Sequence, residues 1–157
     1  MESIIGSNWK FRHVAVVVRD MDQAVGQYES ILGSGIFRPE TLMDSSTFSD
    51  YTVYGKKTPD VHKSRFKHSD IGPDKIDLEF ISPVEGKPIY RDFLEKHGEG
   101  LHHIAFAVDD LDAETAKLVA RGIPVITSVK RPNGRGFAYF DFGSCLIELI
   151  GAVKQES

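Results

Sequence analysis

The sequence predicts an α+β fold built from two tandem βαβββ modules, and three observations support this prediction. A short apolar strand with a histidine at its third position occurs twice, with His13 and His103 separated by 90 positions (103 minus 13). An acidic segment and a helical pattern follow each of these strands. Each copy then ends in an apolar strand that carries a glutamate, Glu79 in the first and Glu148 in the second. We therefore interpret the chain as an internal duplication.

The strands that open and close the two copies have the clearest patterns. The opening strands are predicted at 11–18 (FRHVAVVV) and 101–108 (LHHIAFAV), which are rich in β-branched and aromatic residues. The closing strands are predicted at 76–81 (IDLEFI) and 145–150 (CLIELI). The dipeptide Ser82-Pro83 is expected to end the first of these.

Three helices are predicted from apolar residues at helical spacing and from residues that favour helix ends. The first covers 21–32, where Asp20 or Asp22 can cap the start and Gly33 stops the helix. The second covers 87–97, ends at Gly98 and links the two copies. The third covers 111–121 and stops at Gly122.

The remaining segments are predicted with less regular patterns. Residues 37–43 and 47–54 resemble strands, whereas polar and apolar residues alternate less cleanly at 61–68. Residues 55–60 are expected to form a mobile loop. In the second copy, strands are predicted at 124–130 and 136–142 on either side of a Pro132-Asn133-Gly134 turn. Each half therefore contains the elements of one βαβββ module.

Composition and charge favour a small-molecule partner. The chain has 157 residues and a net charge of −4, which argues against nucleic-acid binding because that requires a concentrated basic face. The single Cys145 cannot form an internal disulfide, and its apolar neighbours suggest an inert thiol. No apolar stretch approaches the length of a membrane-spanning helix, and no signal-peptide pattern is present. We therefore expect a cytoplasmic protein with no membrane association.

The histidine faces of the two opening strands have small neighbours. Alternate side chains of a strand share a face, so His13 lies with Ala15 and Val17, and His103 lies with Ala105 and Ala107. The opposite faces carry mainly bulkier residues and are expected to pack against the helices. The histidine faces are therefore predicted to line a cavity.

The two glutamates are predicted to require a cation. Glu79 and Glu148 lie among apolar strand residues, where an ionised carboxylate is costly to desolvate unless a cation or donor meets it. One divalent ion bound by both glutamates and both histidines would meet this need, and the donor set suits zinc, nickel, cobalt, manganese or ferrous iron. The alternative is that the histidines are core or edge residues and the glutamates point outward.

These residues resemble the vicinal oxygen chelate superfamily, which includes glyoxalase I, methylmalonyl-CoA epimerases, extradiol dioxygenases and bleomycin-binding proteins. The resemblance covers nearly the whole chain and implies a single domain over 1–157, with modules at about 10–83 and 100–152. It implies an open, cup-shaped, eight-stranded sheet around one divalent metal ion and a homodimer. By this resemblance the metal ligands are His13, Glu79, His103 and Glu148.

The segment FLEKHGEGLHHIA (93–105) resembles methylmalonyl-CoA epimerases in particular, whereas residues 40–70 do not. The resemblance implies proton abstraction next to a carbonyl, through a metal-stabilised enediolate, in an epimerase or isomerase acting on an acyl-CoA such as methylmalonyl-CoA. By similarity to glyoxalase I, the base is a glutamate ligand that loosens, with Glu148 preferred over Glu79. The alternatives are a glyoxalase I-type lactoylglutathione lyase and a non-catalytic binding protein like the bleomycin-resistance proteins.

Several further residues are assigned by position. Phe137 and Tyr139 are expected to line the cavity, and Arg135 to meet a substrate carboxylate or solvent. His102 is expected to pack on the bulky side of its strand, while His62, His68 and His97 are expected at the surface. The basic residues between 56 and 67 are interpreted as a solvated strand face, with substrate steering as the alternative.

Overall fold

The computed structural model describes residues 5–58, 60–131 and 135–151. The chain folds as two compact units that do not follow the linear order of the sequence. The N-terminal unit consists of His13–Thr47 and Asp60–His102. The C-terminal unit consists of Met1–Arg12, Phe48–Pro59 and His103–Ser157. The predicted Pro132-Asn133-Gly134 turn lies outside the described residues.

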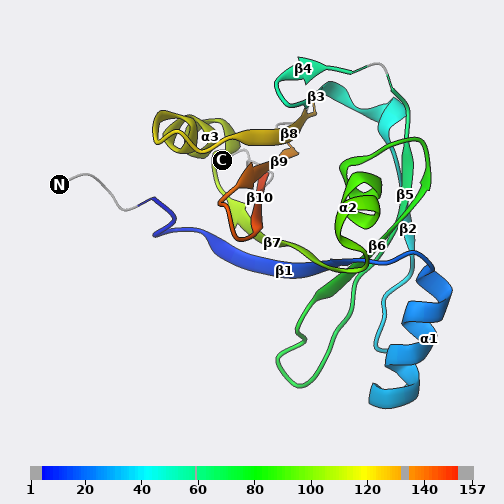
Figure 1. Cartoon of the computed structure of the whole chain (residues 1–157). Coiled ribbons are helices and arrows are strands. Elements are labelled where there is room, and N and C mark those ends of the chain that lie inside the picture. The colour runs from blue at the N-terminus through cyan, green and yellow to red at the C-terminus, as the bar shows by residue number, and fades with distance from the viewer. Residues whose placement is uncertain (1–4, 59, 132–134, 152–157) are drawn as a thin grey trace. The chain divides into compact units, whose positions relative to one another are not determined.

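Strands alternate with three α-helices along the chain (Figure 1). The helices are α1 (Met21–Leu32), α2 (Ile89–His97) and α3 (Leu111–Ala120), with a short 3-10 turn at Ser45–Thr47. The strands are β1 (Lys10–Val17), β2 (Thr41–Asp44), β3 (Ser49–Val53), β4 (Lys56–Lys57), β5 (Lys63–Lys67), β6 (Leu78–Glu85), β7 (Gly100–Val108), β8 (Val125–Lys130), β9 (Gly136–Asp141) and β10 (Leu146–Gly151). The described residues thus form ten strands, where eight were predicted.

In the N-terminal unit, strands pair in the order β2-β5-β6-β1, and β1 runs parallel to β6. Helices α1 and α2 both contact β6 (Figure 1). The core under α1 contains Met21, Val25 and Phe80, with Val16 packed against it. The bulky face of β1 therefore meets a helix, as predicted, while the opposite face carries His13.

In the C-terminal unit, strands pair in the order β7-β10-β9-β8-β3-β4, and β7 runs parallel to β10. Helix α3 contacts β9 and β10 (Figure 1). Val108, Leu118 and Phe140 belong to its buried core, and Phe106 packs against it. The bulky face of β7 again meets the helix, which leaves His103 on the other face.

The first closing strand was predicted to end at Ser82-Pro83, and this was wrong. Strand β6 continues to Glu85, and Pro83 pairs with Ser64 of β5. The pairing of β6 with β1 ends at Val17 and Ile81. Because proline lacks an N–H, it is tolerated where a strand has only one bonded neighbour, which is the position of Pro83.

Strand β3 pairs with β8 rather than with strands of the first copy. Thr52 is opposite Ser128, and their hydroxyl oxygens lie 2.8 Å apart. The segment predicted as a loop at 55–60 contains the short strand β4, which returns antiparallel to β3. Strands β3 and β4 thus extend the sheet of the C-terminal unit beyond the predicted module.

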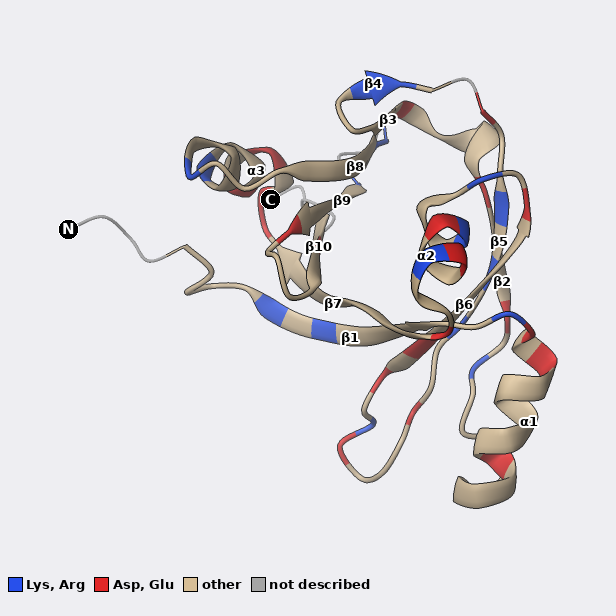
Figure 2. Cartoon of the chain, viewed as in Figure 1, with Lys and Arg blue, Asp and Glu red and all other residues tan. Residues whose placement is uncertain are grey.

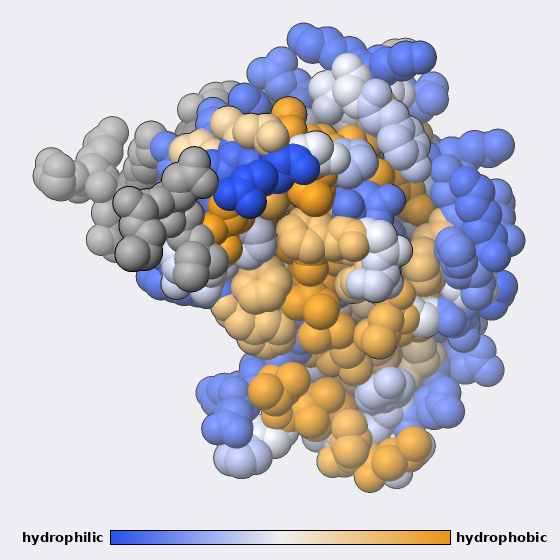
Figure 3. Space-filling view, turned by 60° about the vertical axis from the view of Figure 1, so that its left-hand side comes forward, coloured by the Kyte–Doolittle hydropathy of each residue, from blue (hydrophilic) through white to orange (hydrophobic). Residues whose placement is uncertain are grey.

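Acidic and basic residues are interspersed over most elements, and basic residues mark β4 and the first half of β1 (Figure 2). The basic residues expected to form a solvated face mostly have acidic partners: Lys57 pairs with Asp50, and Arg65 with Glu40. One face also exposes hydrophobic side chains (Figure 3).

Among the described residues, no helix is long and apolar enough to cross a membrane.

A buried glutamate ties the segment before β1 to α3. Trp9 Nε1 donates to Glu114 Oε2 (2.9 Å), and Lys117 Nζ donates to Glu114 Oε1 (2.6 Å). Burial alone would raise the pKa of Glu114, but the hydrogen bonds from Lys117 and Trp9 outweigh it and hold the pKa below its usual value of 4.5.

This geometry predicts an acid-dependent loss of stability. Because the folded-state pKa is lowered, the contribution of Glu114 is present above pH 4.5 and is lost as the pH falls through the folded-state pKa. Glu114→Gln is expected to lower the free energy of unfolding at pH 7 by about 1–2 kcal/mol and to weaken its decline below pH 4.5. Urea titrations followed by fluorescence of Trp9, the single tryptophan, measure both effects. An unchanged pH profile would contradict this assignment.

Candidate metal centre

The first histidine and the first glutamate meet within the N-terminal unit. Parallel pairing of β1 with β6 sets Ala15 opposite Glu79, so His13 and Glu79 project from the same face of the sheet. His13 Nε2 lies 3.0 Å from Glu79 Oε2, and the two side chains are 6% and 7% exposed. The structure therefore brings these two predicted ligands together in a buried pair.

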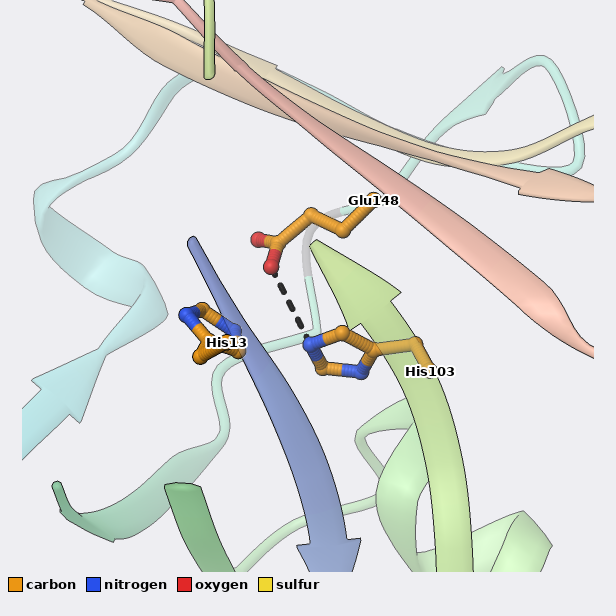
Figure 4. Close-up of side chains that lie close together, drawn as sticks. All are labelled: His13, His103 and Glu148. Carbon is orange, nitrogen blue, oxygen red and sulfur yellow. Dashed lines mark ion pairs between the residues drawn. The ribbon is translucent and has the colours of Figure 1, made fainter. Parts of the chain in front are cut away.

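The second pair lies within the C-terminal unit and repeats the arrangement. Parallel pairing of β7 with β10 sets Ala105 opposite Glu148. His103 Nε2 lies 3.1 Å from Glu148 Oε2, and the side chains are 0% and 8% exposed. Figure 4 shows the Glu148 carboxylate turned toward the His103 ring. In both units the glutamate is thus opposite the residue two positions after the histidine.

The chemistry of these pairs fits a divalent cation. A buried carboxylate pays a large desolvation penalty unless positive charge or donors compensate it, and each glutamate has an imidazole nitrogen at contact distance. Neutral imidazole and carboxylate oxygen are common ligands of first-row divalent metals. His103 and Glu148 belong to one group that could hold an ion, and His13, His68 and Asp77 form another. The residues present therefore fit the predicted cofactor.

A third histidine, expected at the surface, extends the first pair. His68 Nε2 lies 3.2 Å from Glu79 Oε1, and His68 Nδ1 lies 3.0 Å from Asp77 Oδ2. Asp77 Oδ2 also pairs with Arg38 Nη2 at 2.8 Å. Asp77 precedes Glu79 by two positions in the sequence.

The surroundings of His68 favour its charged form. Burial lowers the pKa of His68, but hydrogen bonds and charges from Asp77 and Glu79 more than offset it and raise the pKa to about 9. Both ring nitrogens face carboxylates, which only accept hydrogen bonds, so both must donate. His68 is therefore held between the carboxylates of Asp77 and Glu79.

The other histidines divide between buried and exposed positions. His62 was expected at the surface but is buried, and its backbone N–H donates to Ser45 Oγ (2.8 Å). Burial lowers the pKa of His62, and the charge of Asp44 opposes this shift. His97 is exposed, as predicted. The buried His102 ring packs against Tyr90 and Phe93, with ring centroids 5.2 Å and 5.0 Å away.

Two of the three predicted substrate-binding residues line a cavity in the C-terminal unit. The cavity has a volume of about 520 Å³. Its lining consists of three arginines and mainly small or apolar residues: Arg12, Arg131, Arg135, Ala107, Gly136, Phe137, Ile150 and Gly151. Tyr139 is not part of the lining; its ring centroid lies 4.8 Å from that of the His103 ring.

Burial raises the pKa of the partly buried Cys145 thiol, in agreement with an inert side chain.

The match of this sequence to a protein-family model establishes the family of the chain. Residues 12–140 match the Glyoxalase/Bleomycin resistance protein/Dioxygenase superfamily. The chain belongs to this superfamily. The match confirms both the predicted resemblance and the predicted fold class.

Relatives of this glyoxalase superfamily member include named epimerases. The ethylmalonyl-CoA/methylmalonyl-CoA epimerase of Cereibacter sphaeroides is 29% identical over 148 residues, which cover 89% of this chain and 96% of that protein. The mitochondrial methylmalonyl-CoA epimerase of Homo sapiens is 25% identical over 158 residues, which cover 95% of this chain and 79% of that protein.

Solved structures of low sequence identity share the fold. Methylmalonyl-CoA epimerase from Mycobacterium tuberculosis has a TM-score of 0.60 at 21% identity, covering 90% of this chain and 87% of that one. A Streptomyces coelicolor methylmalonyl-CoA epimerase variant in complex with 2-nitronate-propionyl-CoA has a TM-score of 0.59 at 20% identity, covering 91% and 96%. At these identities the likeness concerns the fold alone.

Proposed function

We propose that the protein is a divalent-metal-dependent epimerase that removes and returns the proton next to the carbonyl of an acyl-CoA, with methylmalonyl-CoA as the candidate substrate. The observation that carries the proposal is the recurrence of a buried His–Glu pair at the same register in both units. The names of the epimerase relatives support the choice of reaction and substrate.

The proposed metal ligands are His13, Glu79, His103 and Glu148, all on one ion. A shared ion explains why both carboxylates tolerate burial, because one divalent cation compensates two negative charges. Zinc, nickel, cobalt, manganese and ferrous iron all suit this donor set. When bound, such an ion supplies Lewis-acid polarisation of the substrate carbonyl.

Glu148 is the proposed base and Glu79 the second choice. The substrate C–H bond breaks as an O–H bond forms on the Glu148 carboxylate. When the carboxylate returns this proton to the other face of the same carbon, the O–H bond breaks and a new C–H bond forms, which completes epimerisation without a net change in atoms. Glu148 is buried beside His103, and the His103 ring packs against the Tyr139 ring.

The arginine-lined cavity is the proposed site for the phosphate groups of CoA. Three arginines, Arg12, Arg131 and Arg135, line this cavity together with apolar residues that include Phe137 and Ile150. Among the described residues, Arg12 and Arg131 form no ion pair; the Arg131 guanidinium lies over the Phe48 ring at 5.7 Å. Basic residues also mark the neighbouring half of β1 (Figure 2). Guanidinium groups bind phosphate through paired charged hydrogen bonds.

If these arginines bind the phosphate groups of CoA, their replacement should weaken the binding only of substrates that carry the CoA nucleotide. Arg131→Gln is expected to raise KM for methylmalonyl-CoA about tenfold, because one charged contact contributes about 1.4 kcal/mol. The KM for methylmalonyl-pantetheine, which lacks the nucleotide, should stay unchanged. Lys57→Gln is the control, since Lys57 is an exposed cation of the same unit. Equal changes for both substrates would contradict the assignment.

Isotope uptake tests the proposed reaction. In D₂O with added Co²⁺, the protein is expected to incorporate deuterium at carbon 2 of methylmalonyl-CoA, measured by mass spectrometry. With methylglyoxal and glutathione it should form no lactoylglutathione. Product formation from the second mixture alone would favour the lyase alternative. Ligand binding that neither requires metal nor leads to turnover would favour the binding-protein alternative.

The homodimer and the cytoplasmic location stay predictions. Some large apolar side chains are exposed, including Phe11 (51%) and Leu101 (67%), and such residues are frequent at protein–protein interfaces. One face with exposed hydrophobic side chains is visible in Figure 3. A sedimentation measurement would establish the oligomeric state.

A further inference from the structure

Four side chains form a chain of contacts behind Glu79 in the N-terminal unit. Arg38 pairs with Asp77, Asp77 with His68, and His68 with Glu79. His13 contacts Oε2 of Glu79, whereas His68 contacts Oε1. The two oxygens of this carboxylate therefore point toward two different imidazole rings.

Asp77 holds His68 in place through a carboxylate that is itself fixed. In addition to Arg38 and His68, the backbone N–H of Ser69 donates to Asp77 Oδ1 (3.3 Å). The fully buried Ser69 hydroxyl donates to the Ile76 carbonyl (3.2 Å) and accepts from the Leu78 N–H (2.8 Å). The backbone on both sides of Asp77 is thus fastened to the segment that carries His68.

The second copy lacks this arrangement, which makes the duplicated pairs unequal. Lys67 is opposite Phe80 in the antiparallel β5–β6 ladder, so the next residues facing each other are His68 and Glu79. In the β9–β10 ladder, the residue opposite Glu148 is Tyr139. The position two before Glu148 is Leu146, which has no polar side chain and cannot replace Asp77. Glu148 therefore has a tyrosine where Glu79 has a carboxylate-bound histidine.

We propose that His68, fixed by Asp77 and Arg38, is a positioning residue that orients Glu79 as a metal ligand. This inference rests on the proposed function. The contact between His68 Nε2 and Glu79 Oε1 orients Oε1 away from the His13 side and restrains rotation of the carboxylate. A glutamate held at both oxygens is a poor base, because it must break one contact before it accepts a proton.

Metal affinity and catalysis separate this role from a merely structural one. His68→Leu is expected to weaken Co²⁺ binding to metal-free protein 10- to 100-fold, measured by chelator competition. At saturating Co²⁺, kcat should stay within a few-fold of wild type, because Glu148 is unaffected. His68→Gln, which keeps a donor near Glu79, should restore most of the affinity. His97→Leu is the matched control, since His97 is exposed on α2.

The outcomes distinguish this inference from the proposed function. If wild-type protein binds no divalent metal, the proposed function fails. If wild type binds Co²⁺ and His68→Leu binds it equally well, the positioning role is overturned and the proposed function stands. A loss of kcat in His68→Leu at saturating Co²⁺ as large as that of Glu148→Gln would also overturn it. If His68→Leu does not fold, Asp77→Asn replaces it, with a several-fold loss of affinity expected and an unchanged affinity overturning the role.

Discussion

Glu148→Gln is expected to lower kcat for methylmalonyl-CoA epimerisation by about three orders of magnitude, because positioned general bases contribute about 10²- to 10⁴-fold. Glutamine keeps the size of the side chain and an oxygen that can face His103, but it cannot accept the substrate proton. Deuterium incorporation at carbon 2 in D₂O, measured at saturating metal, reports this step directly.

The matched control for this substitution is Glu114→Gln. Glu114 is also buried in the C-terminal unit, but it contacts Trp9 and Lys117 rather than a histidine. It should therefore lower stability without removing proton transfer. Near-normal deuterium incorporation by Glu148→Gln would exclude Glu148 as the base, and a selective loss in Glu79→Gln at saturating metal would assign that role to Glu79.

Removal of divalent metal is expected to reduce turnover by about 10³-fold or more, because metal stabilisation of developing charge contributes several kcal/mol. Dialysis against a chelator followed by kinetic assay measures the loss, and Co²⁺ or another first-row divalent ion should restore activity. His103→Ala should show the same loss and should not recover at the metal concentration that restores wild type.

The control for the histidine substitution is His97→Ala, which changes an exposed imidazole of α2. This variant should lose activity on chelation and recover it on metal addition, as wild type does. Full activity of wild-type protein after exhaustive chelation would contradict a catalytic role for the metal.

The helices were predictable from the sequence because local chemistry sets their ends. Helix α1 covers the predicted residues 21–32, with Asp20 Oδ1 accepting from the Gln23 N–H (3.0 Å). Asp110 caps α3 in the same way through the Ala113 N–H (2.9 Å). The partner of β3 was not predictable, because pairing with β8 joins residues far apart in sequence and residue patterns alone do not specify partners.

The two His–Glu pairs were predictable because the duplication repeats them. A single buried histidine has many structural explanations, but the same residue types at matching positions in two copies favour one shared role. His68 was missed for the converse reason: its counterpart in the β9–β10 ladder is Tyr139, so no repeat marked it. Its alignment with Glu79 depends on the register of two strands, which the sequence does not reveal.

The number of divalent ions bound per chain tests the central claim most directly. Equilibrium dialysis with Co²⁺ should give one ion per chain for wild type and almost none for either His13→Ala or His103→Ala, because both histidines are proposed to share that ion. Two ions per chain in wild type, with each substitution removing only one of them, would contradict a single shared site.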